Sequence, residues 1–190
     1  MPLFHWFILA LWLVFIVYWG ISALGAKRSV RGAVWWRHVI VRLVMAVLIV
    51  IAVKVPTIRH ALQAALHQQP GNMLVQAIGA LLVALGIAFA IAARVHIGRN
   101  WGMPMSRTQD PELVTGGPYA LVRHPIYTGV LVALLGSVIG YGLVWLPALL
   151  LSALYFIYSA RREEALMCEQ FPEQYPAYMR RTKMLLPFVL

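Results

Sequence analysis

The stretch GGPYALVRHPIYTG, residues 116–129, places an arginine and a histidine directly before a long apolar run. Two glycines allow tight backbone geometry at its start, and Pro125 suits the first turn of a helix, where its missing N–H would have no partner. The pattern therefore predicts that His124 stands at a helix N-terminus. Because charged groups at the edge of hydrocarbon are costly, Arg123 and His124 mark a candidate functional site.

The composition around this stretch is that of an integral membrane protein. Of 190 residues, 62% are hydrophobic and 12% are charged, which is too apolar for a chain whose surface must be wetted. Residues 3–24 and 72–93 carry no charge, and each reaches the roughly 20 residues that a membrane-crossing helix needs. No basic stretch precedes the first span, and basic residues follow it, so we expect it to remain as a membrane helix and not to be a cleaved signal peptide (Lys27, Arg28, Arg31).

Three further spans complete an all-α, polytopic membrane fold with about five transmembrane helices. One is predicted over residues 36–55, where long arginine side chains near its start can reach the interface. Two shorter spans, 126–139 and 143–158, are separated by Gly140–Gly142 and predict a tight helical hairpin. Cytoplasmic interfacial helices are expected beside it. The glycine pair Gly136 and Gly140 indicates close helix packing.

The basic residues predict the orientation of these spans. If the N-terminus lies outside, 14 of the 16 Lys and Arg residues fall on the inner side, which the positive-inside rule favours. We therefore expect a protein of the inner, cytoplasmic membrane with a cytoplasmic C-terminus. The same bias explains the net charge of +10 without nucleic acid. No metal site is expected, because His5, His60 and His67 lack acidic or cysteine partners at ligand spacing.

The hairpin brings its two polar flanks together. On one flank, the helix N-terminus at His124, the charge of Arg123 and the Tyr127 hydroxyl suit an anion. On the other, Glu163 and Glu164 suit an amine or ribose hydroxyls, and two tyrosines follow at i, i+3 spacing (Tyr175, Tyr178). Facing anion and cation sites predict a zwitterionic ligand. The alternative is a solvated interfacial helix whose ion pairs have no catalytic role.

The segments LVTGGPYALVRHPIYTG and EEALMCEQFPEQYPAYM, joined by the hydrophobic hairpin, resemble the isoprenylcysteine carboxyl methyltransferase family and its phospholipid-methylating relatives. The resemblance covers residues 94–188. It implies methyl transfer from S-adenosylmethionine at the cytoplasmic membrane face without a Rossmann domain, and no strand followed by G-x-G-x-x-G is evident. The chain is then a single membrane domain, 1–190, with three transmembrane helices in 1–93 and the cofactor-binding region in 94–190.

The resemblance also implies the site residues. Carried over by motif, the cofactor contacts are Glu112, Leu113, Val114, Tyr119, His124, Pro125, Ile126, Tyr127 and Glu163. Arg94, Gly98 and Trp101 resemble the family's R-x-x-x-G-x-x-W stretch. This chain departs from prenylcysteine-modifying members at Ser159, where an arginine is expected. On a helix only Arg162 could replace that arginine, because Arg161 faces nearly the opposite way.

The methyl acceptor stays open at this stage. A carboxylate acceptor needs no base, whereas an ammonium must first lose a proton, for which Glu164 and Tyr178 are candidates. We expect Glu164 and Arg162 to serve the reaction and the acceptor to be a small amphiphile that enters from the bilayer. Alternatives are a phospholipid N-methyltransferase, a sterol-reductase-like enzyme that uses NADPH, and a non-catalytic membrane scaffold or lipid-binding protein.

Overall fold

The structure is a computed structural model, and it describes residues 2–23, 56, 60, 64, 72–98, 101 and 112–186. Within these residues every regular element is helical, apart from one isolated parallel bridge between Val122 and Lys183. This confirms the all-α prediction. The elements are α1 (Pro2–Ala23), α4 (Met73–Ile97), η2 (Gly117–Ala120), α5 (Pro125–Gly140), η3 (Leu143–Trp145), α6 (Leu146–Gln170) and α7 (Gln174–Arg181).

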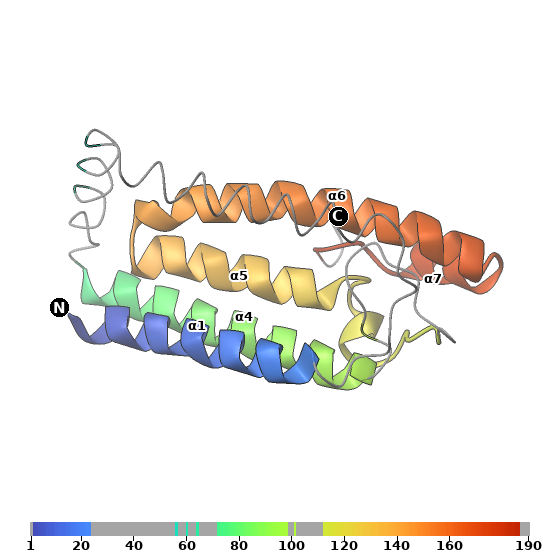
Figure 1. Ribbon diagram of the computed structural model, residues 1–190, viewed down its shortest axis with the longest axis horizontal. Helices are drawn as coiled ribbons and strands as arrows, with labels where there is room; N and C mark the ends of the chain where they lie inside the picture. The colour runs from blue at the N-terminus through green and yellow to red at the C-terminus, as the bar shows by residue number, and fades with distance from the viewer. Residues whose placement is uncertain are drawn as a thin grey trace.

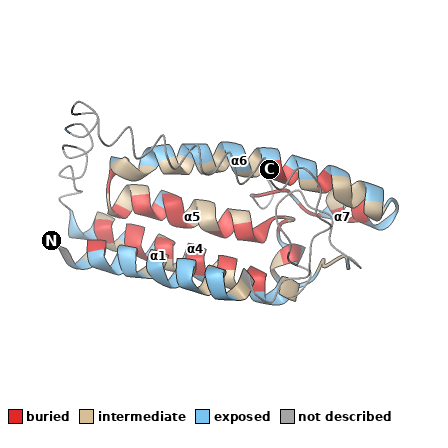
Figure 2. Cartoon of the chain, in the orientation of Figure 1, coloured by how far each residue is buried: buried red, intermediate tan, exposed pale blue. Residues whose placement is uncertain are grey.

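Three segments of the described chain are long and apolar enough to cross a membrane: Leu3–Ser22, Met73–Ile97 and Leu143–Gln170. The helix Pro125–Gly140 is apolar but shorter, as the hairpin prediction requires. The span predicted over residues 36–55 lies outside the described residues. Figure 2 shows buried residues concentrated on α4 and α5, while α1 and α6 expose much of their apolar surface, which suits contact with lipid.

The second arm of the hairpin is longer than predicted. We expected it to end near Tyr158, but α6 runs on to Gln170 and carries Glu163 and Glu164 within one continuous helix. The charged residues do not end the helix because arginine and glutamate are good helix formers, and because Glu164 is paired with Arg123. The carboxylates are therefore held rigidly relative to the membrane part of α6.

Glycines set the distance between α4 and α5. A Cβ added at Gly79 would lie 2.3 Å from the Cα of Gly140, and one added at Gly86 would lie 2.5 Å from the carbonyl oxygen of Gly129. A Cβ at Gly136 would likewise meet the backbone of α4. Only glycines permit two helix backbones to approach this closely. The predicted packing role of Gly136 and Gly140 is confirmed.

Helix α1 is hydrogen-bonded to the α4–α5 pair at two places along its length. Midway, the Trp12 indole N–H donates to the Ser137 hydroxyl at 3.0 Å. At the end of α4, the Arg94 guanidinium donates to the carbonyls of Gly98 at 2.7 Å and Ser22 at 2.6 Å. Its Cζ also lies 4.5 Å from the centre of the Trp101 ring. Arg94, Gly98 and Trp101 therefore contact one another at the end of α4, which continues past the predicted end at Ala93 to Ile97.

The arrangement of the helices gathers the polar segments at one end. Figure 1 shows α1, α4, α5 and α6 running along the long axis, with η2, α7 and the start of α5 together at the end opposite the N-terminus. The hairpin turn between α5 and α6 lies at the other end. Residues 112–128 and 159–186 thus meet, as the short hairpin predicted.

The glycine contact provides a test of this packing. We expect Gly86→Ala to destabilise the protein by about 1–3 kcal/mol, because the new methyl group forces α4 away from α5. The measurement is the thermal unfolding midpoint in a mild detergent. Gly20→Ala is the matched control, since a Cβ there meets nothing within 4 Å and should leave the midpoint equal or slightly higher. Equal midpoints for the two variants would contradict the close contact.

Candidate functional site

The glycine-rich loop before α5 delivers His124 to the end of the bundle. Gly117 has φ +56°, and a Cβ there would lie 2.7 Å from the His96 ring, so glycine is required on both grounds. A short 3-10 turn over Gly117–Ala120 follows. His124 then occupies the N-cap of α5, with Pro125 in the first turn, as predicted. Its side chain makes no capping hydrogen bond, so the imidazole is available to α6.

Residues 182–186, for which no role was predicted from the sequence, complete the start of α5. The backbone N–H groups of Arg123 and His124 donate to the carbonyls of Lys183 at 2.8 Å and Met184 at 3.1 Å. The Thr128 hydroxyl donates to the Leu185 carbonyl at 2.6 Å. The His124 bond satisfies an N–H group that a helix start leaves without a partner, and the other two bonds hold the segment against α5. In the sequence, the only indication of this contact was the apolar run of residues 184–186, which is too short to predict that the segment would lie against the start of α5.

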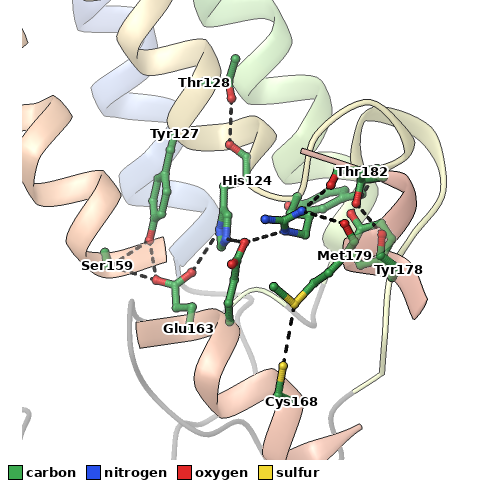
Figure 3. Close-up of polar contacts among 12 residues, drawn as sticks. His124, Tyr127, Thr128, Ser159, Glu163, Cys168, Tyr178, Met179 and Thr182 are labelled. Atoms are coloured by element: carbon green, nitrogen blue, oxygen red, sulfur yellow. Dashed lines mark hydrogen bonds and ion pairs between the residues drawn. The ribbon is translucent and has the colours of Figure 1, made fainter. Parts of the chain in front are cut away.

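The two polar flanks meet in a four-residue charge cluster. Glu164 Oε1 accepts from Arg123 Nε at 2.6 Å and lies 3.3 Å from His124 Nε2. The other imidazole nitrogen, Nδ1, lies 3.5 Å from Glu163 Oε2. Figure 3 shows His124 and Glu163 turned toward one another from the start of α5 and from α6. The predicted anion and cation sites are therefore adjacent, but they pair directly with each other.

Tyr127 and Ser159 orient the second carboxylate. The Tyr127 hydroxyl donates to Glu163 Oε1 at 2.5 Å, and the Ser159 hydroxyl donates to the same oxygen at 3.0 Å (Figure 3). The Tyr127 ring stacks between those of His124 and Phe156, with centroid distances of 5.5 and 4.4 Å. Ser159, where the resemblance led us to expect an arginine, is fully buried, and its hydroxyl is occupied by the bond to Glu163.

Arg123 and Tyr178 connect the cluster to α7. Arg123 Nη1 donates to the carbonyls of Thr182 and Met179, which places a cation at the C-terminal end of α7, where it interacts favourably with the helix dipole. The Tyr178 hydroxyl donates to the Tyr119 carbonyl at 2.5 Å. Burial raises the pKa of Tyr178 to about 12. Tyr178 is therefore a protonated donor near neutral pH, which argues against it as a base.

The remaining predicted residues divide into buried and exposed groups. Val114, Tyr119, Ile126 and Tyr127 join one apolar cluster, and Trp101 packs against it. Pro125 is fully buried in the first turn of α5, and Leu113 is half-buried. Glu112 and Arg162 are exposed, whereas Glu164 is buried. The structure thus brings His124, Tyr127, Glu163 and Glu164 together and leaves Arg162 on the outer surface of α6.

The protonation of His124 is controlled by its neighbours. Burial by itself lowers the pKa of His124, but hydrogen bonds and charge from Glu163 and Glu164 outweigh burial, so the pKa lies above the ordinary histidine value. A protonated His124 balances one carboxylate and Arg123 balances the other. The cluster is then neutral as a whole, which suits its buried position.

The model of the phospholipid methyltransferase family matches residues 74–174, more than half of the chain. The chain belongs to this family. The prediction from the short motifs is confirmed, and the matched region contains α4 from its second residue, α5, α6 and the whole charge cluster. The protein is accordingly a member of a family of membrane methyltransferases that act on lipid-like acceptors.

Similar proteins support the fold and differ in length. The eukaryotic intramembrane Ras methyltransferase ICMT (isoprenylcysteine carboxyl methyltransferase) aligns with a TM-score of 0.55 and 24% identity, over 84% of this chain and 55% of that one, which shows a shared fold. The nickel-cobalt-cadmium resistance protein NccN of Alcaligenes xylosoxydans xylosoxydans is 35% identical over 113 residues, 58% of this chain and 52% of its own. The cobalt-zinc-cadmium resistance protein CzcN of Cupriavidus metallidurans is 34% identical over 58% of this chain and 51% of its own. The chain spans about half the length of these curated relatives.

The charge state of His124 predicts how stability depends on pH. Because the pKa of His124 is raised in the folded protein, its stabilising contribution is complete below about pH 6.5 and is lost as the pH rises through the folded value. We expect the difference in unfolding midpoint between the wild type and His124→Asn to be largest near pH 6 and to shrink toward pH 9. Thermal unfolding in detergent across this range measures it. A difference that does not change with pH would show that folding does not raise the pKa of His124.

Proposed function

We propose that this protein transfers a methyl group from S-adenosylmethionine to an amphiphilic, lipid-like acceptor at the cytoplasmic face of the membrane. The observation that carries the proposal is the convergence of His124, Tyr127 and Glu163 at one end of a membrane bundle, within the region that matches the methyltransferase family. The positive-inside rule supports the cytoplasmic orientation, because an N-terminus outside would put 14 of the 16 Lys and Arg residues on the inner side.

The chemistry of the donors fits this cofactor. Its amino-acid end carries a carboxylate and an ammonium. The backbone N–H groups of Ile126 and Tyr127 lie in the first turn of α5, where a helix supplies no partner, and they suit the carboxylate. Glu163 suits the ammonium, because its side chain is 25% exposed whereas that of Glu164 is 10% exposed.

The apolar cluster beside the start of α5 suits the remainder of the cofactor. Val114 and Tyr119 lie in the cluster that includes Ile126, directly next to the charged residues. An aromatic and an aliphatic surface can accept a base ring by stacking and apolar contact. Glu112, two residues before Val114, is exposed and suits contact with a polar part of the cofactor.

The role of the protein is to align the reacting groups and to exclude water from the site. When bound, S-adenosylmethionine supplies a methyl group on a sulfonium that already carries its leaving group, so alignment matters more than acid–base chemistry. Glu163 is held by the hydroxyls of Tyr127 and Ser159, which keeps its position constant during the reaction. The buried faces of α5 and the 182–186 segment keep the site dry.

Glu164 is better suited to holding the site than to removing a proton. Its carboxylate is committed to Arg123 at 2.6 Å and lies 3.3 Å from His124. Glu163 retains exposed surface and is the carboxylate that an entering group can reach. We therefore assign cofactor contact to Glu163 and a supporting role to Glu164. Arg162, exposed on α6, remains a candidate only for contact with an acceptor headgroup.

The cofactor assignment predicts the behaviour of Glu163→Gln. We expect its affinity for S-adenosylhomocysteine to fall at least ten-fold, about 1.4 kcal/mol, because the amide cannot form an ion pair with the ammonium. Isothermal titration of the purified protein in detergent measures this, with NADPH as the rival ligand. Glu173→Gln is the matched control, since Glu173 is exposed beyond α6. Heat from NADPH and none from the methyl-transfer ligands would reject the proposal in favour of a reductase.

The charge cluster, together with the serine in place of an arginine at Ser159, predicts which acceptor the protein prefers. The two cations of the charge cluster are already paired with its two carboxylates, so this cluster offers no free cation for an acceptor carboxylate. We expect slow transfer to a farnesylcysteine analogue and faster transfer to extracted membrane lipids, measured with methyl-labelled S-adenosylmethionine. Rapid methylation of the farnesylcysteine analogue that is lost in Arg162→Ala would reverse this preference and identify Arg162 as the carboxylate contact.

A further inference from the structure

Arg123 lies outside the set of residues assigned to the cofactor, yet its side chain connects the charge cluster to the end of α7. Its Nε donates to Glu164 on α6, and its Nη1 donates to the Met179 and Thr182 carbonyls at the end of α7. The side chains of Arg123 and Glu164 are each only 10% exposed. Arg123 is therefore a buried, permanently charged group at the junction of three segments.

The distances rank the partners of the two carboxylates. Glu164 Oε1 is 2.6 Å from Arg123 and 3.3 Å from His124, so the arginine is its nearer partner. Glu163 Oε2 has His124 at 3.5 Å and no arginine among the ion pairs of the described residues. His124 contacts both carboxylates, through Nε2 to Glu164 at 3.3 Å and through Nδ1 to Glu163 at 3.5 Å. Because Arg123 is the nearer partner of Glu164 and balances its charge, the charge of the His124 imidazole is needed only by Glu163.

Loss of Arg123 would disturb this division. One imidazolium would then face two carboxylates, and the more buried Glu164 would compete for it most strongly, since charge interactions strengthen as water is excluded. The imidazole would turn toward Glu164 or Glu164 would take up a proton. In either case Glu163 would lose the partner that sets its position and charge.

We propose that Arg123 is a positioning residue for methyl transfer: it neutralises Glu164 and thereby reserves His124 for Glu163, the carboxylate that meets the cofactor. This inference rests on the proposed function. It assigns Arg123 no contact with the reacting atoms.

A purely structural role is the competing explanation that an experiment must separate. The bonds from Arg123 to the Met179 and Thr182 carbonyls hold the end of α7 against the start of α5. A neutral side chain at this position loses those bonds as well as the charge. Restoring the charge balance without restoring the carbonyl bonds distinguishes the two roles.

The experiment is a double-mutant cycle of Arg123→Gln and Glu164→Gln in the full chain. The readouts are the affinity for S-adenosylhomocysteine, the turnover of S-adenosylmethionine with extracted lipids, and the thermal unfolding midpoint. We expect Arg123→Gln to weaken binding at least ten-fold. The double variant should recover to within about three-fold of the wild type, because removing both charges leaves His124 with Glu163 alone. Arg161→Gln, exposed on α6, is the matched control and should bind as the wild type does.

Arg123→Lys keeps the proposal testable if the glutamine variant does not fold. Lysine retains the charge but cannot reproduce the fork of donors, so binding should stay within about three-fold of the wild type while the unfolding midpoint falls. Loss of binding in Arg123→Lys, or no recovery in the double variant, would overturn the positioning role and leave Arg123 as a structural bond to α7. Absence of binding in the wild type would instead reject the proposed function, and this inference with it.

Discussion

The site depends on the pairing of two consecutive carboxylates on α6 with two consecutive cations at the start of α5. Buried charges are tolerated only when they are balanced and hydrogen-bonded, and here Arg123 and His124 meet Glu164 and Glu163 at 2.6 to 3.5 Å. This constraint explains why α6 can bury Glu164 while it continues to Gln170. It also holds the start of α5 against α6 at the end of the bundle opposite the hairpin turn.

The glycine contact between α4 and α5 gives this pairing a rigid base. Helices that touch backbone to backbone through Gly79, Gly86 and their partners cannot slide without steric overlap, so the start of α5 has one position relative to α4. The 182–186 segment then saturates the N–H groups of Arg123 and His124. Together, the glycine contact and the 182–186 segment fix the backbone of His124 and so orient its imidazole, although the imidazole makes no capping hydrogen bond to α5.

Much of the site was readable from the sequence because its residues are grouped in two short motifs. The RHPIY stretch predicted a helix start, and the hairpin predicted that the Glu163–Glu164 pair would return to it. Both predictions rest on local rules, namely the position of proline in a helix and the reach of a short loop. The sequence could not show which charge pairs with which. The same residues can form either two facing sites for an anion and a cation or a closed cluster of ion pairs. The supporting contacts of Thr128 and the 182–186 segment had no motif to indicate them.

By itself, the sequence determined that this is an all-helical membrane protein of a methyltransferase family, because hydropathy over twenty residues and the spacing of a few polar residues are local properties of the chain. Only the tertiary structure decided that Glu164 pairs with Arg123, that Glu163 is the more accessible carboxylate, and that the Ser159 hydroxyl donates to Glu163. The Ser159–Glu163 bond joins residues four apart on α6, but the ion pairs depend on distances of about 3 Å between side chains some 40 residues apart in the chain. Distances of that kind are set by how α5, α6 and α7 pack, and no single stretch of sequence contains them.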